Sequence, residues 1–182
     1  GHRSFVSDGF RDALFPAHHV TLAYFLPFDE KRPTDPLPEG EWRWGDQINR
    51  DEVQRWFEAF DCRHPDFPHE EVRGALFRTG WNDHWFEPDF WRRGGPTLSD
   101  DAVRYLMDRG LHYLASDFTF TFEPGRAHDI VLKHPDGNRF FVEGLCNLGG
   151  IQSDLVALLV APLKLQGAEA LPARVYAIEI AG

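Results

Sequence analysis

The chain is organised around the sequence RFFVEGLCNL, residues 139–148, which has the pattern of an apolar strand that ends in a single glutamate. Residues 127–129, AHD, precede it as a short helical turn that carries a histidine. A carboxylate after two phenylalanines and a valine loses hydration, so Glu143 needs a cation, a cluster of hydrogen-bond donors or a proton. His128 is the nearest upstream group that could share a cation, and imidazole and carboxylate both suit zinc and manganese. A buried histidine and a Glu–Arg pair would explain the same pattern without a metal.

Outward from this stretch, strand patterns and helix patterns mix along the chain. Apolar or alternating runs predict strands at residues 18–28, 72–79, 111–117, 118–122, 155–165 (broken by Pro162) and 173–180. Asn49 with Glu52 forms a capping box that opens one helix, and Ser99 caps another. Prolines and charges predict an extended loop over 29–45, either plain surface or a lid. No linker is visible, so we expect one α/β domain over residues 1–182 with a mixed sheet.

Composition narrows the functional classes. The 182 residues are 42% apolar and 26% charged, as in an ordinary soluble globular domain. The net charge of −10 argues against a nucleic-acid partner or an anionic membrane. Cys62 and Cys146 form no CxxC motif, which favours reduced thiols and a cytoplasmic location, and no apolar run is long enough to span a membrane. The chain begins Gly1-His2 without a signal peptide, so we expect a tag remnant or a trimmed N-terminus.

Two further features are candidate site elements. The segment 81–91 holds Trp81, His84, Trp85 and Trp91, and an exposed loop does not need three tryptophans. These rings therefore either pack in the core or line a pocket. Asp117 follows a strand pattern, where a functional carboxylate is common, although a turn cap would explain it as well.

Several short motifs, taken in order, resemble the bacterial kynurenine formamidase and cyclase family. They are FRTGW (77–81), PTLS (96–99), SD (116–117), AH (127–128), EGLCNL (143–148), APLKL (161–165) and PAR (172–174). The resemblance covers roughly residues 74–180. It implies a β-rich, swivelling α/β domain that assembles as a homodimer or homotetramer. It also implies a metal-dependent hydrolase, with zinc or manganese, that opens amides, lactams or lactones such as N-formylkynurenine, isatin or dienelactone.

The family's N-terminal metal motif, His-x-Gly-Thr-His-x-Asp-x-Pro-x-His, is altered in this chain. Placing its proline on Pro16 aligns no better than placing it on Pro27, and only Pro27 lies in a strand-like run. The Pro27 alignment puts His19 at the first histidine, Ala23 and Phe25 at two ligand positions, and Asp29 at the last histidine. The motif is therefore degenerate.

By this resemblance, the metal ligands are His19, His128 and Glu143, a His₂Glu set of the kind that holds catalytic zinc. Catalysis would fall to His128 and to Asp29 as proton shuttle. The substrate would be a small, planar, ring-bearing molecule in a pocket lined by Trp81, His84, Trp85, Trp91 and Asp117. Two alternatives stay open. One is a non-catalytic binding or scaffold protein; the other is metal-free hydrolysis by Asp29 or Asp117 with His84 or His128.

Overall fold

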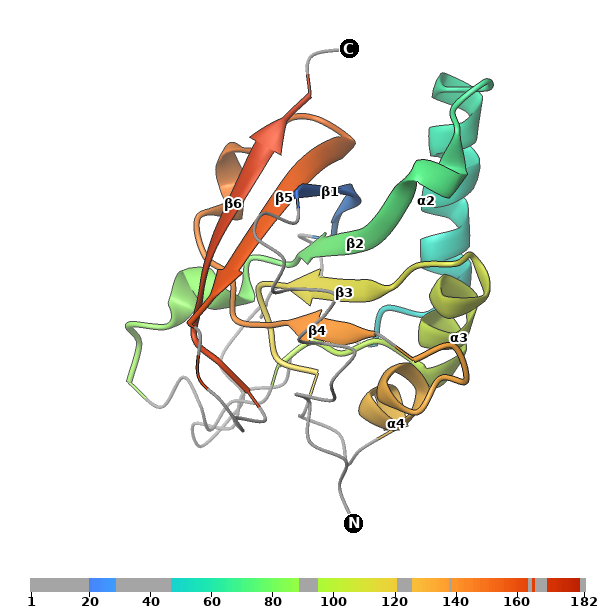
Figure 1. The fold of residues 1–182 in the computed structure, drawn as a ribbon. Coiled ribbons are helices and arrows are strands. Elements are labelled where there is room, and N and C mark those ends of the chain that lie inside the picture. Colours follow the sequence, from blue (N-terminus) through green and yellow to red (C-terminus); the bar gives the residue numbers. More distant parts are fainter. Residues whose placement is uncertain are drawn as a thin grey trace, which may run out of the picture.

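A computed structural model describes residues 20–28, 47–88, 95–120, 126–137, 139–163, 165 and 170–180. Among these residues the chain builds one curled, six-stranded mixed sheet with the order β4-β3-β2-β1-β5-β6 (Figure 1). The strands are β1 (Val20–Pro27), β2 (Val72–Arg78), β3 (Tyr113–Ser116), β4 (Phe140–Val142), β5 (Leu155–Pro162) and β6 (Ala173–Glu179). The predicted α/β fold with a mixed sheet is therefore confirmed.

Three α-helices of the described ranges lie on one face of the sheet: α2 (Arg50–Arg63), α3 (Asp100–Asp108) and α4 (Arg126–Leu132) (Figure 1). Both predicted helix starts are confirmed. Asn49 and Glu52 form the reciprocal capping box of α2, and the Ser99 side chain accepts a hydrogen bond from Ala102 N at 3.2 Å. The apolar stripes of these helices pack with β1, β2 and β3 into the larger core, while a smaller core covers the opposite face of the sheet.

Strands β1 to β4 run parallel, so their carboxyl ends meet at one edge of the sheet. The register pairs Leu26 with Phe77, and Phe77 with Ser116, in neighbouring strands. The residues that follow the four strand ends are therefore placed along this edge: Phe28, Thr79, Asp117 and Glu143. In open sheets of this kind, ligands bind at the carboxyl edge.

The antiparallel strands β5 and β6 extend the sheet beyond the helices. The register places Val20, Leu159 and Tyr176 in one row on one face. Val20 and Tyr176 are each 53% exposed, and Ile178 on the same face is 52% exposed. A second copy of the chain could cover this apolar face, and the expected homodimer or homotetramer stays a prediction. In the described part of the chain, no helix has the length and apolar character needed to cross a bilayer.

The segment that follows β3 differs from its predicted structure. Residues 118–120 are not a strand, contrary to the pattern: the chain turns after β3, and the Ser116 hydroxyl donates to the Phe118 carbonyl at 2.7 Å. Phe118 and Phe120 pack on each other with 5.0 Å between ring centroids, and both are buried. The alternation of apolar residues here therefore comes from a loop whose aromatic side chains are buried in the core. The proline-rich loop at 29–45 lies outside the described residues.

Candidate functional site

His128 and Glu143 come together at the carboxyl edge of the sheet. His128 lies on α4 and Glu143 directly follows β4, and their Nε2 and Oε1 atoms are 4.0 Å apart. The Glu143 Oε1 atom also accepts a hydrogen bond from Phe120 N at 2.6 Å. The expectation that this carboxylate is buried was wrong, because β4 ends at Val142 and leaves the Glu143 side chain 28% exposed. The Phe120 N–H nevertheless supplies one hydrogen-bond donor to this carboxylate.

This pair lies in a cleft of about 1190 Å³. The walls come from β4, from the segment 143–148 that follows it, and from β5 and β6. Much of the lining is apolar, with Phe140, Val142, Leu158, Val160 and Val175 among its residues. A cleft of this size accommodates a small organic molecule, and an apolar lining with a few polar groups is the usual composition of such sites.

The donor set fits a divalent metal in part. In a tetrahedral zinc site two ligands that each lie about 2.1 Å from the ion are about 3.4 Å apart, so the 4.0 Å between Nε2 and Oε1 has to shorten by about 0.6 Å for both atoms to bind one ion. A catalytic zinc usually has three protein ligands. Within the described ranges, no group of three or more histidine, cysteine or acidic side chains is placed to hold a metal. His128 and Glu143 are therefore two ligands of an incomplete set.

The residues that the resemblance aligned with the N-terminal motif fall into two groups. Ala23 and Phe25 are buried core residues in the middle of β1, at 0% and 5% exposure. His19 and Asp29 lie outside the described residues. Val20, which follows His19, is at the amino end of β1, whereas Phe28, which precedes Asp29, is at the carboxyl edge that also carries Glu143.

The described residues of the aromatic segment do not line this cleft. Trp81 is fully buried in the larger core, because η4 (Trp81–His84) turns it under the sheet edge. Trp85 is 51% exposed and packs on Phe86. His84 pairs with Glu87. None of these residues is among the described residues that line the cleft, and Trp91 lies outside the described ranges.

Asp117 is buried, with 3% of its surface exposed, and caps the loop after β2. Its Oδ2 atom accepts from Thr79 N at 2.9 Å and from Gly80 N at 2.6 Å, and its Oδ1 atom accepts from Thr79 Oγ1 at 2.9 Å. Burial raises the pKa of the Asp117 carboxyl from 3.8 to about 6, against the hydrogen bonds from Thr79 and Gly80, which lower it. These contacts fit the turn-cap interpretation, because the Asp117 oxygen atoms face Thr79 and Gly80 directly after β2. Asp117 is not among the described residues that line the cleft, so its pocket role stays a prediction.

This raised pKa predicts a pH-dependent contribution to stability. A carboxyl with pKa 3.8 unfolded and about 6 folded contributes stability below pH 4, which is lost as the pH rises through 6. The loss amounts to about 1.4 kcal/mol per pKa unit, so about 3 kcal/mol for this shift. We therefore expect the unfolding free energy of wild type, minus that of Asp117→Asn, to fall by up to about 3 kcal/mol from pH 4 to pH 7. Denaturation in urea at several pH values measures it.

The matched control is Asp129→Asn, since Asp129 is an exposed carboxylate on α4 that pairs with Lys133. We expect its difference from wild type to stay nearly constant over the same range. A constant difference for Asp117→Asn as well, or one that grows with pH, would contradict the prediction.

Asn82 is a candidate site residue that the sequence did not reveal. Its side-chain Nδ2 donates to the carbonyls of Gly144 and Leu145, at 3.1 and 2.9 Å, directly after Glu143. The only feature of the sequence that pointed to Asn82 is its position directly after the FRTGW motif (77–81). Nothing local in the sequence relates residue 82 to residues 144 and 145.

Comparisons with known proteins support the fold. No protein-family model and no curated protein matches the sequence. Among solved structures, isatin hydrolase A from Ralstonia solanacearum is 24% identical with a TM-score of 0.59, over 88% of this chain and 60% of its own. A predicted metal-dependent hydrolase from Bacillus stearothermophilus is 24% identical with a TM-score of 0.55, over 86% and 62%. A novel cyclase is 17% identical with a TM-score of 0.57, over 94% and 57%.

These similarities define the architecture. At identities below 25%, what the chain shares with the three proteins is the fold. It is the cyclase-like α/β fold that the sequence motifs implied. The chain spans about three fifths of the length of each of these structures.

Proposed function

We propose that the protein is a metal-dependent hydrolase that opens amide, lactam or lactone bonds in small ring-bearing molecules. The observation that carries this proposal is the His128–Glu143 pair, 4.0 Å apart in a cleft of about 1190 Å³. Two of the solved structures with this fold are named as an isatin hydrolase and a metal-dependent hydrolase, which favours the same class here. The apolar lining suits a substrate with an apolar ring.

In this proposal His128 and Glu143 bind zinc or manganese. When bound, such a metal supplies a water of lowered pKa and polarises the carbonyl of the bond to be opened. The Phe120 N–H fixes one oxygen of Glu143, so the carboxylate keeps its orientation. The apolar side chains of β4, β5 and β6 would hold the ring and exclude bulk water from it.

The other two predicted site residues, His19 and Asp29, lie outside the described ranges. Asp29 keeps the role of proton shuttle that the family resemblance implies, and Phe28, the described residue before it in the sequence, lies at the same edge of the sheet as Glu143. His19 stays a predicted ligand, and the proposal is carried by His128 and Glu143.

A non-catalytic binding protein is the second candidate. It is favoured by Ala23 and Phe25, which occupy core positions where the family motif has ligands. Asp117 and His84 face their own loops, so metal-free hydrolysis by these two residues has no support from the geometry. The hydrolase and the binding protein differ in metal binding, which can be measured directly. Metal-free hydrolysis by Asp29 with His128 stays open, and activity that persists in a chelator would favour it.

Titration calorimetry with zinc and with manganese tests the proposal. We expect wild type to bind one equivalent, and His128→Ala and Glu143→Ala to bind about 100-fold more weakly or worse, since replacing residues that only support a ligand already costs about 10–100-fold. His64→Ala, which removes a partly exposed histidine paired with Asp154, is the control and should bind like wild type. Metal-dependent opening of model lactams and lactones, abolished by a chelator, would complete the assignment.

Either of two results would favour the binding protein. One is a wild-type chain that takes up no metal. The other is metal uptake that both His128→Ala and Glu143→Ala retain in full, which would place the ion elsewhere.

A further inference from the structure

The turn that carries Glu143 has little rigidity of its own. Glu143 lies between Val142, the last residue of the three-residue strand β4, and Gly144, whose φ of +68° is in the left-handed region. Glycine has the widest choice of backbone conformations, so this turn needs support from other segments to hold one geometry. The proposed site needs that geometry, because its two ligands lie on separate elements.

Support comes from two directions. On one side, Gly144 N donates to Phe118 O at 3.2 Å and Leu145 N donates to Ser116 O at 3.0 Å. On the other side, the Asn82 side chain donates to the carbonyls of Gly144 and Leu145. The backbone N–H and C=O groups of both residues are therefore held by hydrogen bonds.

The two sets of hydrogen bonds that hold the turn both depend on the loop after β2. Asp117 lies between Ser116 and Phe118 and is bound to Thr79 and Gly80, while Asn82 follows in the same loop. Trp81, fully buried in the core, fixes the loop between them. Residues 79–82 thus hold the Glu143 turn directly through Asn82, and they bind Asp117 between the two residues whose carbonyls hold its other side.

From this arrangement we infer that Asn82 is a positioning residue for Glu143: its carboxamide fixes the 143–145 turn so that the Glu143 carboxylate faces His128. The inference rests on the proposed metal site. The Asn82 side chain is only partly buried and contributes to neither core cluster, so its contribution lies in these two hydrogen bonds. A residue that supports a ligand in this way usually changes metal affinity about 10–100-fold when it is replaced.

Two measurements on the full chain test this role. We expect Asn82→Ala to weaken zinc binding about 10-fold in calorimetry. Hydrogen exchange of the Gly144 and Leu145 amides, measured by NMR without metal, should accelerate about 10-fold or more, because the turn opens more often. The unfolding midpoint should move by no more than about 4 °C, since the core is unchanged. Asn82→Asp keeps the size of the side chain and removes both N–H donors of the carboxamide. The Gly144 and Leu145 amides of this variant should therefore exchange faster by a similar factor.

Gln54→Ala is the matched control. Gln54 also uses its carboxamide for an exposed hydrogen bond, to Glu58 on α2, and its replacement should leave zinc affinity and the exchange of both amides unchanged. Wild-type zinc affinity in Asn82→Ala, with Glu143→Ala impaired, would overturn the inference and leave the proposed function intact. Unchanged exchange in both Asn82 variants would also overturn it. A wild-type chain that binds no zinc would reject the proposed function and this inference together.

Discussion

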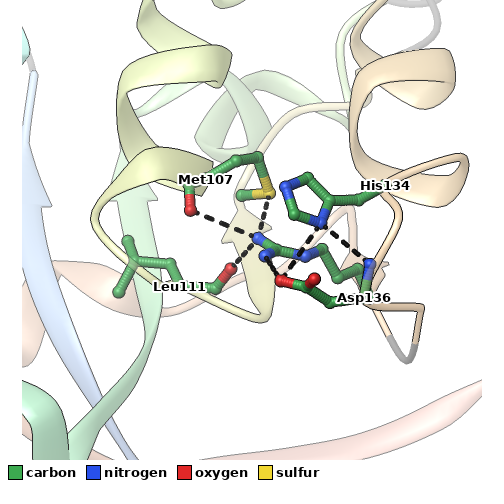
Figure 2. Close-up of polar contacts among 5 residues, drawn as sticks. Met107, Leu111, His134 and Asp136 are labelled. Carbon is green, nitrogen blue, oxygen red and sulfur yellow. Dashed lines mark hydrogen bonds and ion pairs between the residues drawn. The ribbon is translucent and has the colours of Figure 1, made fainter.

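Replacing Arg139 with leucine is expected to lower the free energy of unfolding by about 2–4 kcal/mol. The guanidinium group lies at the start of the segment that contains β4, and only 4% of the Arg139 side chain is exposed. Figure 2 shows its labelled neighbours Met107, Leu111 and Asp136, with the contacts drawn as dashed lines. Its Nη1 atom donates to Leu111 O at 2.5 Å and lies 3.0 Å from Met107 Sδ, while its Nη2 atom pairs with Asp136 at 3.2 Å. Arg139 thereby ties β4 to the end of α3.

The magnitude follows from what leucine leaves behind. The buried Leu111 carbonyl would lose its donor, and an unsatisfied buried acceptor costs about 1–3 kcal/mol. Lost packing of the long side chain adds to this. One effect works in the opposite direction and makes the loss of stability smaller. Among the described residues, Arg139 Nε is a buried donor without a hydrogen-bond partner, and leucine removes the free-energy cost of burying it. Asp136 is 74% exposed, so the loss of its partner costs little.

Denaturation in urea measures this effect, with Asp136→Ala as the matched variant. Asp136→Ala removes the same ion pair from its exposed side, and we expect it to cost less than about 1 kcal/mol. Arg139→Lys keeps a positive charge but lacks the planar group that reaches Leu111 and Asp136 together, so its cost should be intermediate. An Arg139→Leu protein within about 0.5 kcal/mol of wild type would show that the buried network contributes no net stability.

The sequence predicted those parts of the fold whose signals are local. Asn49 with Glu52, and Ser99, marked the starts of α2 and α3 because a capping side chain bonds to a backbone N–H within three residues. Apolar or alternating runs marked β1, β2, β5 and β6, because such a run is also a local feature of the sequence. Strand order and register depend on contacts between distant residues, and no local pattern specifies them.

The candidate site shows the same limit. The pairing of His128 with Glu143 was anticipated, and the structure places His128 Nε2 4.0 Å from Glu143 Oε1. For Trp81 the sequence left core packing and pocket lining both open, because the choice depends on where η4 meets the core. The role of Asn82 was not anticipated, because it depends on hydrogen bonds between residues more than sixty positions apart. The number of tryptophans in a segment does not reveal which of them face a cleft.

Gly74→Ala is expected to destabilise the protein by about 3–5 kcal/mol. Gly74 in β2 lies directly opposite Tyr113 in β3, and a Cβ atom at residue 74 would be 2.1 Å from Tyr113 Cζ. The Tyr113 ring therefore covers the glycine, as aromatic residues often do in sheets. The ring is fully buried, stacks on Phe140 with 5.0 Å between centroids, and its hydroxyl lies 2.8 Å from Thr21 Oγ1.

The ring cannot move aside without losing these contacts. Overpacking a core by one methyl group costs about 1–3 kcal/mol, and occasionally more. Displacing Tyr113 adds about 1 kcal/mol for the hydrogen bond and about 0.5–1.5 kcal/mol for the aromatic pair. The sum sets the expected range. Gly150→Ala is the control, because nothing lies within 4 Å of the Cβ atom it would add, and we expect it to change stability by no more than about 0.5 kcal/mol.

A double-mutant cycle identifies the cause. In a Tyr113→Ala background the added methyl group meets no ring, so Gly74→Ala should become neutral or stabilising by about 0.5–1 kcal/mol, the usual advantage of alanine over glycine in a strand. Urea denaturation of the four proteins gives the coupling energy between the two sites. If Gly74→Ala is equally harmful with and without the Tyr113 ring, the clash is not with that ring, and glycine is required at residue 74 for its backbone alone. A large coupling energy would instead show that Gly74 and Tyr113 act as one unit, which joins β2 to β3 on the face of the sheet that also forms the floor of the cleft.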